Sequence, residues 1–533
     1  MGTLWYGGKV RTLRTEEDVQ EAVFVENGII QQTGSKDELL SRFQNEITEF
    51  EDLKGAVMYP GFVDSHLHII GHGEKLLKLD LSNITSIEAM KSVLKEAAEK
   101  TAPGEWLVGE GFNENLFIDP RIPDREILDE VTTDRPVILS RVCRHASVTN
   151  TYGLELAGIS AETPQPLGGV IVTDMNGEPT GYLLDQAQEL LRGVVPEQSF
   201  DAVKKALETS INDLFSKGFV GGHSEDLNYY GNPLETLKSF YEKIDGEKVK
   251  FRANLLIHHD VADQVLKNSD ITINNNFIEL GSVKIFADGA LGGRTALLRE
   301  VYSDDPTTNG VAMFPLEELQ KIVKHARTLN MPVAIHTIGD LALEYAIESI
   351  ENHPPPSGKR DRLIHLQVTS KDLIDRMKKM SVVLDIQPRF VASDFPWVME
   401  RLGEERMQYS FAWKKLLDAG LMCAGGSDAP IEPVDPILGI HAAVTRRSPD
   451  EKHDGYFPEE KLSLFEAVCL FTKGSAQAIG KEHERGLIHK GYTADFTILD
   501  KDLFDLEPDE WLTVKVEKTV VDNSIMFDRK RDS

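Results

Sequence analysis

Two patterns of hydrophobic and polar positions alternate along the chain. In its outer segments, short apolar or alternating runs are separated by turn residues, which is typical of β-strands. These runs cover residues 4–13, 21–34, 494–500 and 518–528. Asn27-Gly28 lies between two apolar runs and predicts a hairpin. We expect the two ends, 1–56 and 484–533, to pair into one composite β-sandwich domain.

Between these ends, short β-rich runs alternate with amphipathic segments of helical length, which favours a parallel sheet wrapped by helices. The helical segments include 315–330, 370–380 and a closing helix over 463–480. The β-rich runs are 58–68, 218–226, 251–259, 281–289, 332–339, 362–368, 382–388 and 422–430. Eight such strands predict an α/β fold, a (β/α)8 TIM barrel over residues 57–483.

One interval of the barrel is far longer than an ordinary connection. Residues from about 71 to 196 separate the first two predicted strands, whereas loops of compact domains usually have a few residues. We expect an inserted subdomain here. Because it leaves the C-terminal end of the first strand, we expect it to overhang the barrel mouth, where active sites of such barrels lie.

Composition narrows the class of protein. Hydrophobic residues make up 41% and charged residues 27% of the chain, as in ordinary globular proteins. The formal net charge of −29 argues against binding to nucleic acid or to anionic membranes. Neither a cleavable leader nor a run of about 18 apolar residues is apparent, so we expect a cytoplasmic protein. Three scattered cysteines predict neither a disulfide framework nor a thiolate zinc site.

The first predicted barrel strand carries a pair of histidines, His66 and His68. Side chains two apart in a strand project from the same face, so both imidazoles could reach one metal ion. The same spacing also fits two hydrogen-bonded barrel residues. The pair by itself leaves both interpretations open.

Three further side chains lie toward the C-terminal ends of predicted strands. His336 ends the fifth, His365 ends the sixth, and Asp428 ends the eighth. The C-terminal ends of barrel strands meet at one rim, where catalytic residues gather. Four histidines and one carboxylate form a nitrogen and oxygen donor set suited to zinc or a similar divalent ion. We therefore predict a metal site at the barrel mouth.

Lys284 lies in the fourth predicted strand, where burial of an ammonium ion is costly. One interpretation is a salt bridge to nearby Asp288. Another is that burial and metal ions keep the amine neutral, so that it takes up carbon dioxide as a carbamate that bridges two metals. Spacing does not decide between them.

Six segments together resemble one family of enzymes. PGFVDSHLH, KIFADGALGGRTA, AIHTIGD, IHLQ, GSDAP and GLIHKGYTADFTILD are similar to segments of the amidohydrolase superfamily, in its YtcJ-like branch that includes N-substituted formamide deformylases. The resemblance covers nearly the whole chain. It implies a barrel with a terminal β-sandwich and hydrolysis of carbon–nitrogen bonds other than peptide bonds.

The resemblance also implies a binuclear centre, with zinc the expected metal. It assigns His66, His68 and Asp428 to one ion, His336 and His365 to a second, and a bridge between them to Lys284, carboxylated by carbon dioxide. One departure is visible, because the branch usually has glutamate before the sixth-strand histidine and this chain has Ile364. Outer partners of metal ligands tune affinity, so a weaker second metal site, or a single ion, is an alternative expectation.

A bound divalent ion lowers the pKa of water from 15.7 towards about 7. Our hypothesis is that the resulting metal-bound hydroxide attacks an amide carbonyl. Asp428 would be the catalytic residue that accepts its proton and passes it to the leaving nitrogen. A metal-dependent esterase, lactonase or phosphotriesterase is an alternative, since fold and metal set do not fix the substrate. A non-catalytic, metal-binding regulatory protein is a further one.

Residues that contact substrate are harder to identify from sequence. RVCRHASVTN resembles a segment of the branch that returns toward the site, which makes His145 a candidate; a hydrogen bond within the insert is the alternative. Arg294, Arg389 and Trp397 follow predicted strands and are further candidates, against packing or surface ion pairs. The expected partner is a small-molecule substrate. A homodimer of two copies of this chain is a further expectation.

Overall fold

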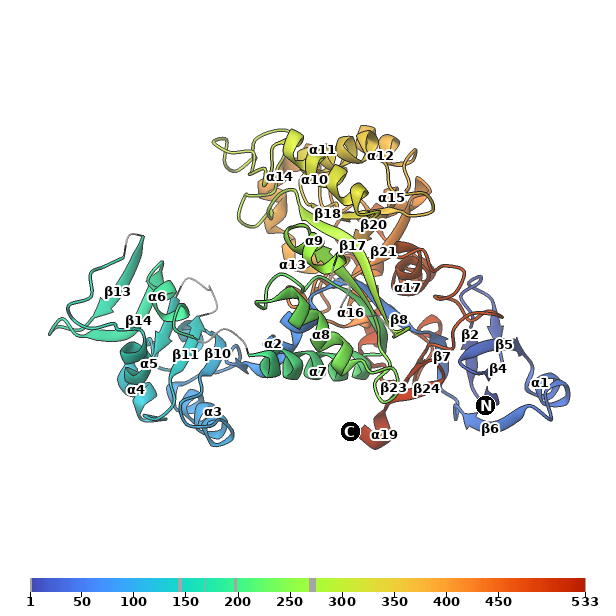
Figure 1. Ribbon diagram of the computed structural model, residues 1–533, viewed down its shortest axis with the longest axis horizontal. Helices are drawn as coiled ribbons and strands as arrows, with labels where there is room; N and C mark the ends of the chain where they lie inside the picture. The colour runs from blue at the N-terminus through green and yellow to red at the C-terminus, as the bar shows by residue number, and fades with distance from the viewer. Residues whose placement is uncertain (1, 142–145, 167, 196–198, 268–274, 533) are drawn as a thin grey trace. The chain divides into compact units, whose positions relative to one another are not determined.

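The computed structural model describes most of the chain. The described residues are 2–141, 146–166, 168–195, 199–267 and 275–532. By their internal contacts they divide into two compact units, one formed by residues up to 72 together with those from 203 onward, and the other by residues 73–202. Figure 1 shows the second unit in cyan and blue-green.

Within the described part of the first unit, eight parallel strands follow one another in chain order around a nearly closed barrel. They are β8 (Phe62–Leu67), β15 (Phe219–Ser224), β16 (Arg252–His258), β17 (Ile278–Phe286), β18 (Val333–Thr337), β19 (Asp361–His365), β20 (Val382–Ile386) and β21 (Met422–Gly425). Each overlaps a predicted run. The (β/α)8 barrel predicted from sequence is confirmed.

Amphipathic helices alternate with these strands, because each buries an apolar stripe against the sheet. They include α7 (Phe200–Ser216), α8 (Pro233–Lys243), α10 (Leu316–Thr328), α11 (Asp340–Asn352), α12 (Lys371–Met377), α15 (Trp413–Asp418), α16 (Pro436–Thr445) and α17 (Leu464–Cys469). In Figure 1, α10, α11 and α12 lie side by side along the yellow edge of the barrel. Their inward faces carry buried residues such as Leu319 on α10, Ala346 on α11 and Leu373 on α12.

Hydrogen bonds connect the first and last barrel strands at the barrel mouth. The Asp428 amide donates to the carbonyl of His66 at 2.7 Å, and the His68 amide donates to the carbonyl of Ala429 at 2.8 Å. The carboxylate of Asp64 accepts from the Ser427 amide at 3.0 Å. Closure of the barrel therefore places Asp428 directly beside the histidine pair.

The first barrel strand is shorter than its sequence pattern predicts. The run over 58–68 divides into β7 (Val57–Pro60), which joins a terminal sheet, and β8, which joins the barrel. Gly61 lies at the break, and a Cβ atom there would lie 2.5 Å from the side chain of Val220. Because only glycine permits this approach, the chain passes from one sheet into the other at Gly61.

Two sheets built from terminal segments face each other beside the barrel. The four-stranded sheet has the order β5-β4-β1-β6, and the six-stranded sheet has the order β24-β23-β22-β7-β2-β3. Their strands are β1 (Gly2–Tyr6), β2 (Lys9–Arg11), β3 (Val19–Gln20), β4 (Ala22–Glu26), β5 (Ile29–Gly34), β6 (Ile47–Asp52), β22 (Phe496–Leu499), β23 (Val516–Val521) and β24 (Ser524–Asp528). Figure 1 shows blue and red strands meeting in this sandwich.

The terminal sheets share one apolar core. Trp5, Val23, Met58, Phe496 and Val520 are among its buried residues, so it combines both ends of the chain. The predicted hairpin joins β4 to β5 in antiparallel register. Asn27 and Gly28 have φ values of 51° and 76°, as a two-residue hairpin turn requires.

The second unit has a sheet of its own, in the order β13-β14-β12-β11-β10-β9. Its strands are β9 (Leu79–Asp80), β10 (Leu107–Phe112), β11 (Val137–Arg141), β12 (Ala146–Thr149), β13 (Gly169–Thr173) and β14 (Pro179–Asp185). Helix α3 (Ile87–Lys100) contributes Met90 and Leu94 to one core of the unit. Helix α6 (Gln188–Arg192) contributes Leu191 to another.

A buried ion pair fastens the terminal segment to the barrel floor. Arg252, at the start of β16, donates from Nη2 to Oδ1 of Asp495 at 2.9 Å, and both side chains are over 90% buried. We expect Arg252→Ala to reduce the free energy of unfolding by about 3–5 kcal/mol, because Asp495 is left buried without its partner. Denaturant unfolding measures this loss.

A matched control for this prediction is Arg376→Ala, which removes a half-exposed pair with Glu351. Such surface pairs contribute about 0–1 kcal/mol. Equal losses in the two variants would contradict the anchoring role of Arg252.

Among the described residues, no helix has both the length and the apolar character needed to cross a bilayer.

Candidate metal centre

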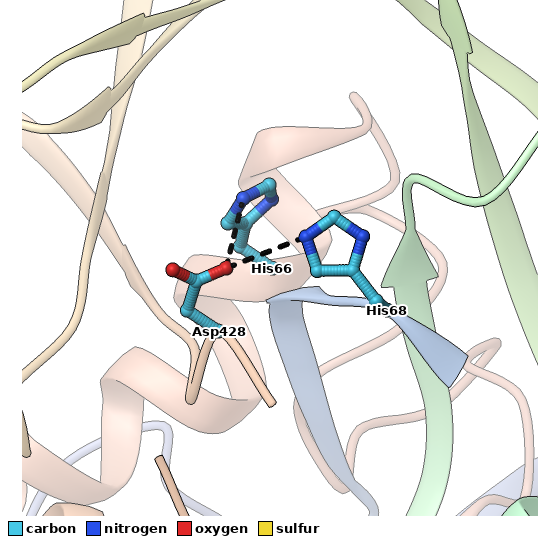
Figure 2. A group of neighbouring side chains, drawn as sticks. All are labelled: His66, His68 and Asp428. Atoms are coloured by element: carbon cyan, nitrogen blue, oxygen red, sulfur yellow. Dashed lines mark ion pairs between the residues drawn. The ribbon is translucent and has the colours of Figure 1, made fainter. Parts of the chain in front are cut away.

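Three side chains converge where the barrel seam closes. His66 and His68 lie on or directly after β8, and Asp428 follows β21. Oδ1 of Asp428 lies 3.5 Å from Nε2 of His66 and 3.6 Å from Nε2 of His68. Figure 2 shows both imidazoles turned toward this one carboxylate. Their candidate ligand atoms all lie within 4.8 Å of one another.

Hydrogen bonds select the nitrogen of His68 that faces the cluster. Its Nδ1 is 2.5 Å from the backbone oxygen of Glu225, so Nδ1 carries the proton and Nε2 faces Asp428. Burial lowers the pKa of His68, but the adjacent carboxylate of Asp428, together with the charges of Asp226 and Glu225, outweighs burial and raises the pKa to about 9. Burial raises the pKa of Asp428, but His68 and the charges of His365 and Lys284 together outweigh burial, so that the pKa is lowered.

Lys284 lies on β17 and is fully buried. Its Nζ is 3.2 Å from Nε2 of His66 and 4.6 Å from the ring centre of Phe286. Burial lowers the pKa of Lys284 to about 8. The predicted alternative, a salt bridge to Asp288, does not form among the described residues, because Asp288 accepts amide hydrogen bonds from Leu297 and residues 338–339 instead.

The remaining two histidines lie next to each other. The ring centres of His336, on β18, and His365, on β19, are 4.5 Å apart, and His365 is 5.4 Å from the ring of His66. Nε2 of His336 lies 2.9 Å from the oxygen of Gly289. Nδ1 of His365 lies 2.7 Å from Oε1 of Gln387. The structure thus brings all six predicted side chains to one end of the barrel.

The position of Ile364 explains the departure from the family pattern. Its side chain packs with Leu256 and Ala334 in a small buried cluster, so no carboxylate lies there. Instead, Nδ1 of His365 donates to Oε1 of Gln387, which follows β20. The outer partner comes from a neighbouring strand rather than from the preceding residue.

We expect Gln387→Met to weaken metal binding by roughly 10–100-fold, since it removes the partner that orients His365. Competition with a chromogenic chelator measures the affinity of each site. Gln367→Met is a matched control, because Gln367 donates to Asp394. The role of Gln387 is wrong if both variants keep wild-type affinity.

Glu225 and Gln387 were not predicted as partners of the histidines, and neither was Asp288, whose Oδ1 lies 3.4 Å from Nε2 of His336. Each lies just beyond the C-terminal end of its strand, β15, β20 or β17. Their position just after barrel strands indicates from sequence alone that these residues lie at the rim. It does not say which of many rim residues contacts a given imidazole.

The predicted substrate residues have partners of their own. Arg294 pairs with Asp304 at 2.7 Å. Arg389 donates to Glu432 at 3.2 Å. Trp397 donates to the backbone of Ser393 at 3.1 Å. His145 lies outside the described residues, and contact of any of the four with substrate stays a prediction.

A second group of candidate ligand atoms lies at the end of β16. His258, His259 and Asp260 gather there, with the two imidazoles stacked 4.6 Å apart. Nδ1 of His258 already faces the amide of Asp260 at 3.3 Å and Asn228 at 3.2 Å. These contacts are typical of histidines with a structural role.

The donor set around His66 fits a divalent cation. Two imidazole nitrogens and a carboxylate face one another at distances longer than good hydrogen bonds. Imidazole and carboxylate ligands suit zinc and related ions.

Comparison with known proteins decides the family. Residues 49–527 match the profile described as "Amidohydrolase family". The chain belongs to the amidohydrolase family. It is 49% identical to YtcJ of Bacillus subtilis (strain 168), over 99% of this chain and 100% of YtcJ. This similarity confirms the branch predicted from sequence.

Two further relatives extend the comparison. The N-substituted formamide deformylase of Arthrobacter pascens is 26% identical, over 98% of this chain and 97% of that enzyme. The crystal structure of an uncharacterized metal-dependent hydrolase from Pyrococcus furiosus is 28% identical, with a TM-score of 0.79, and the match covers 94% of this chain and 99% of that one. Family and structure together make this chain a metal-dependent hydrolase of the amidohydrolase superfamily.

Proposed function

We propose that this hydrolase cleaves a carbon–nitrogen bond other than a peptide bond, in an amide such as an N-substituted formamide. The observation that carries the proposal is the joint presence of His66, His68, Lys284 and Asp428 at the barrel mouth of a chain that is 26% identical to an N-substituted formamide deformylase. Histidines 336 and 365 complete the donor set.

We further propose that the centre holds two divalent ions, with zinc as the preferred metal. His66, His68 and Asp428 would hold one ion, and His336 and His365 the other. Divalent ions at such a site lower the pKa of water and polarise a carbonyl oxygen. His68 is prepared for ligation, because Glu225 holds its Nδ1 and leaves Nε2 toward the cluster.

Asp428 is the proposed proton carrier. Its side chain is 13% exposed, and its Oδ1 lies between the two imidazoles. Its lowered pKa keeps it ionised, ready to accept a proton from the attacking water. The same carboxyl then returns that proton to the leaving nitrogen, so that the amine departs neutral. The hydrogen bond from the Asp428 amide to the His66 carbonyl holds Asp428 beside the two histidines.

Lys284 is the proposed bridge, in carboxylated form. Its complete burial and lowered pKa favour the neutral amine that carbamate formation requires. Nζ of Lys284 lies beside Nε2 of His66 and is therefore directed to the cluster. Within the described chain it forms no ion pair with Asp288. Protein labelled with ¹³C-bicarbonate should show one carbamate ¹³C resonance, and the Lys284→Met variant should lack it. A fully active protein without this resonance would contradict the bridge.

A substrate panel tests the proposed bond class. We expect zinc-loaded protein to hydrolyse N-substituted formamides and other amides faster than matched esters or phosphotriesters, measured as kcat/KM. Exclusive turnover of esters, lactones or phosphotriesters would replace the proposal with that alternative. Absence of turnover throughout the panel, with metal bound, would favour a non-catalytic role.

A further inference from the structure

One ligand histidine differs from the others in its second ring nitrogen. Three of the four candidate imidazoles have that nitrogen hydrogen-bonded by the protein, as described above. Nδ1 of His66 is buried without a partner among the described residues. Metal-bound histidines almost always hold this nitrogen with a carboxylate, a carbonyl or a water molecule. For His66, water is the remaining choice.

Beneath His66, the barrel interior is charged rather than apolar. Arg362, on β19, is completely buried and donates to Asp385 at 2.7 Å and to the backbone of Ser65 at 2.5 Å. Its Nη1 has no partner in the described chain. Barrel interiors are ordinarily filled by layers of branched apolar side chains, so this guanidinium needs a further polar neighbour.

Buried polar side chains with unpartnered atoms also occur toward the barrel floor, the end at which the barrel strands begin. His223, on β15, is 2% exposed, and its Nδ1 lacks a partner among the described residues. Burial, followed by the charges of Arg362 and Arg485, holds its pKa well below the usual range.

At the floor, a cavity of about 30 Å³ is lined by His223, Asn254 and Arg485, among others. Oδ1 of Asn254 and Nε of Arg485 are again buried without partners in the described residues. Gly281 makes room for this amide, because a Cβ atom there would lie 2.2 Å from Asn254 Oδ1. Arg485 pairs with Glu279, which is 29% exposed, so the cavity adjoins the surface.

Donors and acceptors are mixed along this path, which suits water better than an ion of either charge. A water molecule needs about 10–15 Å³ and usually makes about three hydrogen bonds to buried polar groups. The floor cavity has room for about two. Five unpartnered atoms, on His66, Arg362, His223, Asn254 and Arg485, are thereby explained together.

We propose that the barrel interior binds a file of ordered water molecules, which runs from the floor cavity past His223 and Arg362 to His66 and supplies water to the metal centre. Water enters beside the Arg485–Glu279 pair while substrate fills the mouth. The supply role rests on the proposed hydrolysis. The binding of water does not.

Two measurements on the wild-type protein test the binding of water. A high-resolution crystal structure should show ordered waters within hydrogen-bond distance of His223 Nδ1, Asn254 Oδ1 and Arg362 Nη1. Oxygen-17 relaxation dispersion should count long-lived internal waters in solution. A dry interior in both measurements would overturn the proposal, whatever the substrate panel shows.

The supply role is tested with Asn254→Leu, which replaces the polar end of the cavity with an apolar group of similar shape. We expect fewer long-lived waters and a kcat lowered about tenfold, as for loss of an outer partner, with KM and metal content unchanged. Ser475→Ala is the matched control, because Ser475 lines the same cavity but donates to the Val63 oxygen at 2.8 Å. Wild-type kcat in a dehydrated Asn254→Leu would overturn the supply role.

Discussion

Asp428→Asn is expected to lower kcat by about 10²–10⁴-fold, the usual contribution of a positioned general acid and base. Asparagine retains an oxygen near His66 and His68 but cannot accept and return a proton. Steady-state kinetics on the best amide of the panel measures the loss, with metal content determined on the same samples.

A matched control for this variant lies in the same loop. Asp435→Asn changes the residue that begins α16, where its carboxylate accepts from the Ile437 amide at 2.9 Å. Asparagine caps helices about as well as aspartate, so this variant should keep near-normal kcat. Near-normal turnover by metal-loaded Asp428→Asn would remove Asp428 from the proton path.

Lys284→Met should reduce bound metal from about two ions per chain to one or fewer, with hydrolysis reduced by several orders of magnitude. Methionine keeps the length and apolar stem of lysine but cannot carry a carbamate. The predicted loss follows because a bridging anion holds both ions of a two-metal site, which act together on nucleophile and carbonyl. Metal analysis of dialysed protein measures the change.

Lys250→Met is the control for removal of a lysine. Lys250 lies just before β16 and pairs with Asp522 at 2.8 Å, on the terminal sheet. It should retain both ions and wild-type activity. Two ions retained in Lys284→Met would show that the lysine does not bridge them.

The barrel could be predicted because its signal is local and repeated. Strands such as β18 and β20 are short, mainly apolar runs between amphipathic segments, and the histidines at or near the ends of β18 and β19 mark the rim. The division between β7 and β8 could not be predicted. An uninterrupted apolar pattern crosses Gly61, and only the approach of Val220 shows why the chain changes sheets there.

The ligand types were predictable, whereas their support was not. Residue type and strand position identify His66, His68 and Asp428 as neighbours of one rim. The contacts of His68 with Glu225 and of His365 with Gln387 depend on which neighbouring strand presents an oxygen at the correct height. The polar interior at Arg362 and His223 likewise becomes apparent only when separate strands are assembled.

The account depends most directly on where metal ions bind. Anomalous diffraction from zinc-loaded crystals, recorded on both sides of the zinc edge, locates them without reference to any substrate. We expect two peaks about 3.5–4 Å apart, one beside His66, His68 and Asp428 and the other beside His336 and His365, with Lys284 between them. No peak at the barrel mouth, or a single peak at His258 and His259, would contradict the account.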